Sequence, residues 1–340
     1  MPYILITETI NSKQKFLLFY IFVDEFKLFK VMNNKSTILV PVDFRIQSMA
    51  AFEYAKVIAK ATNCSLTLLY VIEETGIFTG AVLKKEQKAE IIKQAGAKLD
   101  ELVSSDKNLE EKNIKAKTVI KKGKVYRQII NLANEIKPVL IIMGRTDSSD
   151  FKKNITGTNT HHIVSEAQIP VITIKGCHEV TTDDHILLPL DLTHPVKKKI
   201  AKAIEVAKFL GARVSILSVL QSNWLSKKIK FQKTLEEIQR IFTKYEVESD
   251  VKLKVCKKNF IYEIINEYAE EIGADLIMMM TQREMDIHQY FIGSTAQDII
   301  NHSELPVLTI IPKPELQLNI KHYLFKELVD PLHVYNVFPE

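Results

Sequence analysis

The stretch "ILVPVDF" (residues 38–44) decides the fold, because it returns as "ILLPLDL" at residues 186–192, an offset of 148. Three further pairs of segments repeat in the same order, at offsets of 148, 136 and 136: 65–71 with 213–219, 140–144 with 276–280, and 170–174 with 306–310. Offsets that hold across several segments indicate a duplicated domain. The offset falls by 12, so we expect a shorter middle helix or loop in the second copy.

Each copy alternates short apolar runs with amphipathic segments. In the first copy the runs predict five strands, at residues 37–43, 65–72, 115–121, 139–143 and 171–175. Continuous apolar runs of this length are typical of parallel strands that are buried on both faces. Strands that alternate with helices indicate βαβ units. The sequence therefore predicts two tandem, doubly wound, Rossmann-like α/β domains.

The helix boundaries follow from residue preferences at helix ends. Ser48 is expected to cap the helix after the first strand, and residues 124–136 read as an amphipathic helix. In the second copy Thr193 is expected to cap the corresponding helix, with Pro195 in its first turn and Gly211 at its end.

The repeat also sets the domain boundaries. We expect a first domain at residues 36–176, a linker at 177–184 and a second domain at 185–312. Residues 1–35 form an N-terminal extension; they are either an added strand or helix, or an over-extended reading frame that begins before Met32. Residues 313–340 form a C-terminal tail with a short helix near "NIKHYLFKELV".

Composition narrows the class of protein. Apolar residues make up 46% and the net charge is only +5, and the lysine runs lack the interleaved aromatic residues of a nucleic-acid surface. The three cysteines form no C-x-x-C pair, which favours a reducing, cytoplasmic setting. No apolar run reaches the roughly 18 residues of a membrane span. We therefore expect no nucleic-acid and no membrane partner, and packing accounts for the single Trp224.

Catalytic and cofactor motifs are missing. No G-x-G-x-x-G follows the first strand, and no G-x-S-x-G elbow occurs. The adjacent His161 and His162 point in different directions on a helix and do not form a metal-ligand pair. No pair of titratable groups has the spacing of an acid–base or nucleophilic site. A binding protein is expected rather than an enzyme.

The stretch "MGRTDSSDFKKNITGT" (residues 143–158) is the strongest candidate for a binding site. It joins a buried strand to a helix start, a position where proteins often hold phosphate. Its Gly144 and Gly157 are separated by Asp147. Nine residues lie between Asp147 and Gly157, and Thr158 follows.

This layout resembles the universal stress protein family. Its members begin with a V-P-V-D strand, as in residues 40–43, and carry a G-x-x-G-x(9)-G-[ST] loop after the fourth strand. The resemblance covers residues 36–176 and 183–312, and only the middle glycine of the first loop is changed, to Asp147. It implies a tandem stress-response regulatory protein, with five-stranded parallel sheets of the adenine nucleotide alpha hydrolase-like fold.

The resemblance also implies a site for ATP or another adenine nucleotide in the first copy. Asp43 would meet the adenine or ribose, Val71 would line the base pocket, and the loop and helix start would hold phosphate. The implied contacts are Val42, Asp43, Val71, Gly144, Arg145, Asp147, Gly157, Thr158 and Asn159. Asp147 either repels the phosphates, with Arg145 to offset its charge, or serves as an oxygen ligand to Mg²⁺.

The second copy carries a degenerate version of this site. Met280 and Arg283 stand at the first two glycine positions, and Met280 is expected to crowd the phosphate pocket. The matching positions are Asp191, Val219, Met280, Arg283, Gly293 and Ser294. A helix N-cap is the favoured explanation for Gly293 and Ser294, and nucleotide binding is expected to be weaker here than in the first copy.

Three functions remain open from the sequence. The first is nucleotide-dependent regulation. The second is an interaction or scaffold module with a decayed pocket, whose fifth strands, Val171–Ile174 and Val307–Ile310, pair within one chain and cover two sheet edges. The third is weak ATP hydrolysis, as the resemblance allows. A further dimer of the whole chain is compatible with each.

Overall fold

The computed structural model describes residues 36–73, 85–111, 113–145, 158–176, 185–194, 196–221, 224–256, 261–280, 282–283, 290–291 and 293–310. The expected N-terminal extension, linker and C-terminal tail lie outside these residues, as do Asp147 and Gly157 of the candidate loop. Within the described part of the chain, no helix is long and apolar enough to span a membrane.

The first domain alternates strands and helices as the apolar runs predict. Its elements are β1 (Thr37–Pro41), α2 (Ile46–Thr62), β2 (Ser65–Ile72), α3 (Lys85–Ser104), α4 (Lys107–Glu111), β3 (Ala116–Lys122), α5 (Val125–Ile136), β4 (Leu140–Gly144), α6 (Thr158–Glu166) and β5 (Val171–Ile174). All five predicted strands are present, with ends that differ by at most two residues.

The second domain repeats this order without α4, and between β9 and α10 it contains a small hairpin, β10–β11. Its elements are β6 (His185–Pro189), α7 (Lys197–Leu210), β7 (Arg213–Leu220), α8 (Leu225–Lys244), β8 (Ser249–Val255), α9 (Ile261–Glu271), β9 (Leu276–Met280), β10 (Gln282–Arg283), β11 (Tyr290–Phe291), α10 (Ser294–His302) and β12 (Val307–Ile310). One helix, α8, takes the place of α3 and α4, which accounts for the shorter middle of this copy.

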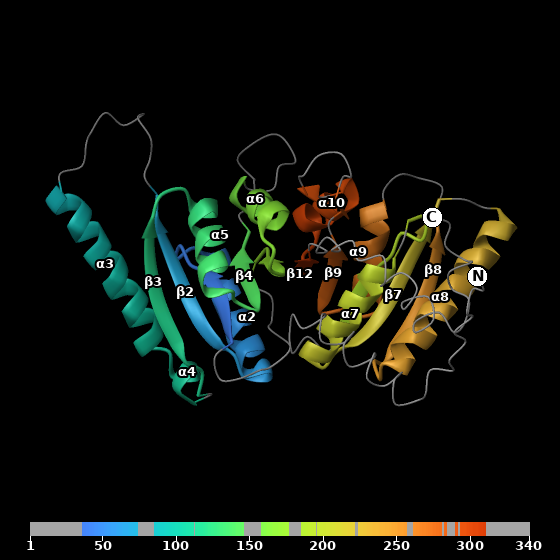
Figure 1. Cartoon of the computed structure of the whole chain (residues 1–340), viewed down its shortest axis with the longest axis horizontal. Coiled ribbons are helices and arrows are strands. Elements are labelled where there is room, and N and C mark those ends of the chain that lie inside the picture. The colour runs from blue at the N-terminus through green and yellow to red at the C-terminus, as the bar shows by residue number, and fades with distance from the viewer. Residues whose placement is uncertain are drawn as a thin grey trace, which may run out of the picture.

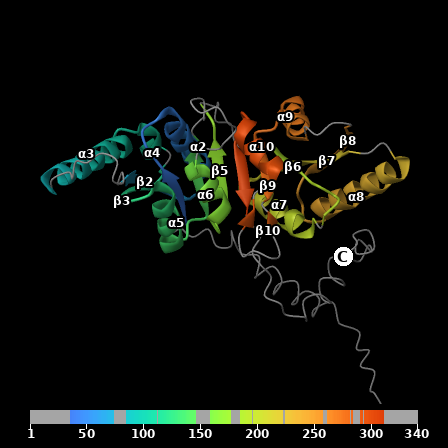
Figure 2. The ribbon, with the colours of Figure 1, turned by 90° about the horizontal axis from the view of Figure 1, so that it is seen from above.

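The two domains share one sheet. Its ten strands run in the order β3-β2-β1-β4-β5-β12-β9-β6-β7-β8, and every pair is parallel except β5 with β12. This central pair lies side by side in the middle of the molecule (Figure 2). The sequence predicts two five-stranded parallel sheets that meet through their fifth strands, and the structure has that arrangement.

Two buried threonines reinforce the central pair. Thr309 Oγ1 donates to the carbonyl of Val171 at 3.2 Å, and Thr173 Oγ1 donates to that of Val307 at 3.4 Å. Each domain thus satisfies a side chain with the backbone of the other, as the internal symmetry requires. Because each fifth strand covers the other, neither presents an open edge for aggregation.

Helices cover both faces of the shared sheet. Side chains of α2, α3, α7 and α8 pack into one apolar core, and those of α5, α6, α9 and α10 pack into another on the opposite face. Figure 1 shows α6 and α10 together above the centre of the sheet, with α2 and α7 below. Strands buried on both sides explain the uninterrupted apolar runs in the sequence.

Two predicted helix caps are wrong. The first helix begins at Ile46, and Ser48 lies inside its first turn, where its hydroxyl donates to the carbonyl of Arg45 at 3.0 Å. The α7 helix begins only at Lys197, and the hydroxyl of Thr193 bonds the carboxylate of Asp191 instead, at 2.6 Å. Gly211 ends α7 with φ 74°, which confirms the predicted C-terminal cap.

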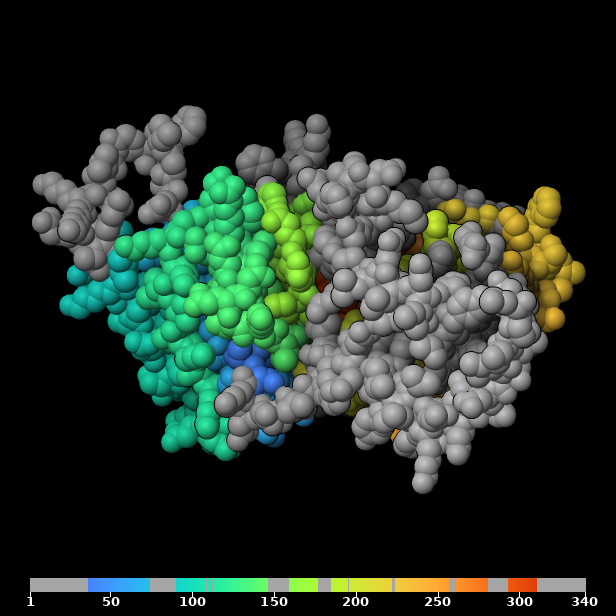
Figure 3. Space-filling view, viewed as in Figure 1, coloured from blue at the N-terminus to red at the C-terminus, as the bar shows by residue number. Residues whose placement is uncertain are grey.

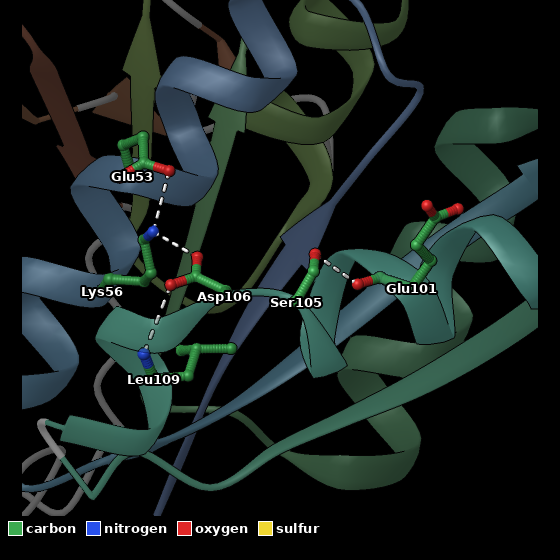
Figure 4. Close-up of polar contacts among 6 residues, drawn as sticks. All are labelled: Glu53, Lys56, Glu101, Ser105, Asp106 and Leu109. Carbon is green, nitrogen blue, oxygen red and sulfur yellow. Dashed lines mark hydrogen bonds and ion pairs between the residues drawn. The ribbon is translucent and has the colours of Figure 1, made fainter.

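A buried ion pair joins α2 to the α3–α4 corner (Figure 4). Lys56 is only 2% exposed, and its ammonium group contacts the carboxylates of Asp106 and, at 2.8 Å, Glu53. Asp106 also accepts a hydrogen bond from the backbone N–H of Leu109 at 3.3 Å, within α4. Since the second domain lacks α4, it needs no such pair, and Ile204 occupies the repeat position of Lys56.

Candidate functional site

The strand order places a natural ligand position beside β1. The chain runs from β1 to β2 and β3 on one side, then crosses over to β4 on the other side of β1. Open α/β sheets bind ligands at the carboxyl ends of the strands where the order reverses in this way. The ends of β1, β2 and β4 carry Val42, Asp43, Val71 and Gly144, so the fold brings these expected site residues to one edge.

Asp43 shapes the turn that leaves β1. Its carboxylate accepts a hydrogen bond from the backbone N–H of Arg45 at 3.0 Å, while the side chain stays half exposed. Asp191 repeats this geometry in the second domain, with the N–H of Thr193 at 2.9 Å. A structural role as a turn former therefore explains the aspartate in both copies, and it leaves the other carboxylate oxygen at the surface.

The valines form the apolar part of this edge. Val42 is buried, and its N–H donates to the carbonyl of Leu69 in β2 at 2.8 Å. Val71, near the end of β2, is half exposed, as is its counterpart Val219 in β7. A partly buried aliphatic side chain at a ligand edge is suited to contact with the face of a nucleotide base.

Gly144 has a packing reason that the sequence does not reveal. A Cβ added at this position would lie 2.4 Å from the backbone carbon and oxygen of Gln47, and 2.6 Å from the nitrogen of Ser48. The first turn of α2 therefore sits directly against β4. The resemblance implies that this glycine serves phosphate, but the approach of α2 alone is enough to require it.

Met280 stands at the repeat position of Gly144, and the structure shows why a large side chain fits there. By the repeat, α7 starts three residues later than α2, because Ile46 corresponds to His194 whereas α7 begins at Lys197. The helical turn that meets Gly144 is thus absent from the second domain. Met280 is buried in the core beneath α7.

Arg145 lies in the interface between the domains. Its side chain is 2% exposed, and Nη2 donates to the carbonyl of Ser303, the residue that ends α10. A cation at a helix C-terminus is favourable for the helix dipole. Asp147 lies outside the described residues, so the expected role of Arg145 toward its charge and toward phosphate stays a prediction.

The start of α6 supplies the remaining expected contacts. The helix begins at Thr158, immediately after the candidate loop, and Asn159 is half buried in its first turn. Free N–H groups and the dipole at a helix N-terminus favour anions. The geometry at Thr158 and Asn159 is thus compatible with a phosphate group.

The corresponding residues of the second domain form an open helix start. Gly293 precedes α10, and a Cβ added there would meet nothing within 4 Å. Ser294 is exposed, and the carbonyl of Gly293 accepts the first helical hydrogen bond, from Gln297 at 3.0 Å. Arg283 lies in β10, where it pairs with Tyr290. This arrangement fits a simple N-cap.

Sequence analysis misses a lysine beside Asp191. Lys199, in the first turn of α7, is half buried; burial lowers the pKa of its ammonium group, and the negative charge of Asp191 partly opposes that effect. In the sequence it is the last of three consecutive lysines, residues 197–199. Only the position of α7 against the sheet distinguishes it from Lys198, which is exposed.

The adjacent histidines take different roles. His162 stacks on Tyr126 with 4.2 Å between ring centroids and contacts Glu166 at 3.1 Å. Burial and the neighbouring His162 lower the pKa of His161. Among the described residues, no three His, Cys, Asp or Glu side chains are close enough together to hold a metal ion.

Comparisons with known proteins agree with this architecture. The family model described as "Universal stress protein family" matches residues 35–175 and 184–310. Universal stress protein YxiE of Bacillus subtilis is 28% identical over 152 residues, which cover 42% of this chain and 100% of that protein.

Two solved structures illustrate the range of similarity. The crystal structure of a universal stress protein from Archaeoglobus fulgidus covers 83% of this chain and 100% of its own, with a TM-score of 0.64 and 23% identity, and so shares the two-domain fold. A universal stress protein from the same organism in complex with dAMP covers 39% of this chain and 100% of its own, with a TM-score of 0.31 and 23% identity.

Proposed function

This chain belongs to the universal stress protein family, and from that premise we propose that its first domain binds an adenine nucleotide and acts as a nucleotide-dependent regulatory protein. What supports the proposal is the strand order, which brings Asp43 and Val71 to the carboxyl ends of β1 and β2 next to β4, together with a helix, α6, that begins at Thr158 in the chain after β4. An apolar side chain, a surface carboxylate and a helix N-terminus match a base, a ribose and a phosphate in turn.

The roles of the residues follow from their positions. Val71 contacts the base, and Asp43 Oδ2, which lies 3.7 Å from Arg45 Nε at the surface, accepts a hydrogen bond from a ribose hydroxyl. Backbone N–H groups at Thr158 and Asn159 hold phosphate. Gly157, which precedes them in the sequence, lets the backbone approach without a Cβ. A bound Mg²⁺ would neutralise phosphate charge, with Asp147 as its protein ligand.

Binding is tested by comparing equivalent positions in the two domains. Val71→Glu places a negative charge beside the bound nucleotide, and we expect Mg-ATP binding to weaken about tenfold or more. Val219→Glu makes the same change at the half-exposed counterpart in β7 and should leave the affinity unchanged. Isothermal titration calorimetry with millimolar Mg-ATP measures both variants. A wild-type chain that gives no saturable heat would exclude the proposal.

The role of Asp147 is tested by restoring the glycine that the family pattern has at this position. If Asp147 holds Mg²⁺, as proposed, Asp147→Gly should weaken Mg-ATP binding and leave metal-free ATP binding little changed. If it only repels phosphate, the variant should bind metal-free ATP more tightly, by up to a few kcal/mol. Asp150→Gly serves as the control. It removes another acidic residue of the same loop, at a position that is not one of the glycine positions of the family pattern.

One observation favours the alternative of an interaction module. Arg145, which follows Gly144 in the sequence, donates a hydrogen bond to the carbonyl of Ser303 across the domain interface. If the segment that follows β4 serves only to hold the two domains together, a bond from Arg145 to the other domain is the expected use of this side chain. The two functions differ in one result, since the interaction module binds no nucleotide in either domain.

A further inference from the structure

The first turn of α8 presents large apolar side chains to solvent. Trp224 is 72% exposed, Leu225 70% and Ile229 49%, although such residues normally supply buried area. The expectation that packing accounts for Trp224 is therefore wrong. Leu225 and Ile229 lie one helical turn apart on the same side of α8, away from the stripe of Phe231, Leu235 and Ile238 that packs on the sheet.

Lysines lie close to these apolar side chains in the sequence. Lys227, Lys228, Lys230 and Lys233 all lie between Trp224 and Leu235, and no Asp or Glu occurs in that stretch. The ammonium group of Lys227 lies 5.9 Å from the centre of the Trp224 ring. We call Trp224, Leu225, Ile229 and these four lysines the α8 patch.

The charge of the α8 patch opposes the needs of its own helix. Cations near a helix N-terminus are unfavourable because they face the positive end of the dipole. The first turn of α8 has no acidic residue, and Trp224 at the N-cap makes no side-chain capping bond. An anionic partner removes this conflict, because it meets the lysines and the helix dipole with charge of the opposite sign.

The helix α8 lies at one end of the molecule. Figure 2 shows α3 at one end of the molecule and α8 at the other, far from the central strands. In Figure 3 atoms of α8, in gold, form the outer edge of the second domain. The nucleotide site proposed above lies in the first domain, at the carboxyl ends of β1 and β2. The α8 patch lies in the second domain and is therefore independent of that site.

We propose that the α8 patch is a docking surface for an anionic lipid bilayer. Interfacial segments combine Trp and Leu, which enter the boundary between headgroups and acyl chains, with lysines that contact anionic headgroups. The contact that we propose is peripheral, with the side chains of the α8 patch at the bilayer surface. The sequence-based expectation of no membrane partner considered only membrane spans and does not detect such a surface.

Vesicle binding tests the proposal directly, because Trp224 is the only tryptophan of the chain. Mixed phosphatidylglycerol and phosphatidylcholine vesicles should sediment the full-length protein at low salt and shift its tryptophan emission to shorter wavelength. Pure phosphatidylcholine vesicles should do neither. Raised salt should weaken binding, because lysines and headgroups attract through a screened charge interaction.

Matched variants separate the contributions of charge and apolar contact. Lys227→Gln with Lys230→Gln should weaken vesicle binding about tenfold or more, since each lysine near an anionic surface contributes roughly fivefold. Lys115→Gln with Lys117→Gln removes two exposed lysines of the first domain as a control. Leu225→Ser with Ile229→Ser should also weaken binding, whereas Ile46→Ser, at a side chain 67% exposed on the first domain, should not.

Three results would overturn the proposal. The first is no sedimentation with anionic vesicles at low salt. The second is sedimentation that the Leu225→Ser and Ile229→Ser changes leave intact, because the attraction would then be charge alone. The third is a change of mass in solution when these side chains are replaced without vesicles, since the α8 patch would then join copies of this chain.

Discussion

Replacing Asp106 by alanine is expected to lower the free energy of unfolding of the first domain by about 3 kcal/mol. The change removes the closest carboxylate from Lys56, which is 2% exposed and cannot reach bulk water. It also removes the hydrogen bond that Asp106 accepts from the backbone N–H of Leu109 in α4. Glu53 remains 2.8 Å from the ammonium group, so the loss should fall at the lower end of the range for broken buried pairs.

The second domain suggests how to repair this variant. Ile204 holds the position of Lys56 there, in a domain without α4. Replacing both partners, Lys56→Ile with Asp106→Leu, should recover most of the stability, because an apolar pair leaves no buried charge behind. Urea unfolding followed by circular dichroism measures all variants. Asp100→Ala, at an exposed acid on α3, is the control and should cost less than about 1 kcal/mol.

The single and double variants together show whether the buried pair of Lys56 and Asp106 stabilises the first domain. Should Asp106→Ala unfold at the same urea concentration as Asp100→Ala, the pair contributes nothing beyond a surface contact. A double variant as unstable as the single one would show that the site needs the carboxylate for capping α4 rather than for neutralising Lys56.

Gly144→Ala is the second large effect, and we expect a loss of about 3 kcal/mol. The new Cβ would lie 2.4 Å from backbone atoms of Gln47, closer than real Cβ atoms come, so α2 or β4 must move. Backbone atoms of a helix cannot turn aside as a flexible side chain can. Thermal unfolding or the urea midpoint, recorded by circular dichroism, gives the size of the loss.

Two other glycines provide controls for Gly144. A Cβ at Gly176 or at Gly293 meets nothing within 4 Å, so Gly176→Ala and Gly293→Ala should change stability by less than about 1 kcal/mol. If Gly144→Ala is as stable as these controls, the close approach of α2 is not what requires the glycine. A function in phosphate binding would then be the better explanation for it.

Much of the fold is predictable because it rests on local and repeated patterns. The runs at residues 38–44 and 186–192 indicate equivalent first strands, and the PVITI and PVLTI segments lead into the strands that pair as β5 and β12. Parallel strands buried on both faces leave a strong apolar signal, whereas helix starts do not. Ser48 fails as a predicted cap because Arg45 and Ile46 already begin the helix three residues earlier than expected.

The site is less predictable because its key contacts join residues far apart in the sequence. Arg145 bonds Ser303 over 158 positions, and Lys56 bonds Asp106 over 50. No local pattern distinguishes these cations from solvated ones. For Trp224 the error has the opposite direction: the sequence predicts a packed side chain, and the structure exposes it. Its exposure depends on how far α8 extends beyond its buried stripe rather than on the residues beside it.

The central claim is that the two copies have diverged, with a nucleotide site in the first domain and none of comparable affinity in the second. Equilibrium dialysis of the purified full-length chain against labelled ATP with Mg²⁺ counts the sites most directly. The account predicts one nucleotide per chain, lost in Val71→Glu and kept in Val219→Glu. No bound nucleotide, or two sites of equal affinity per chain, would contradict it.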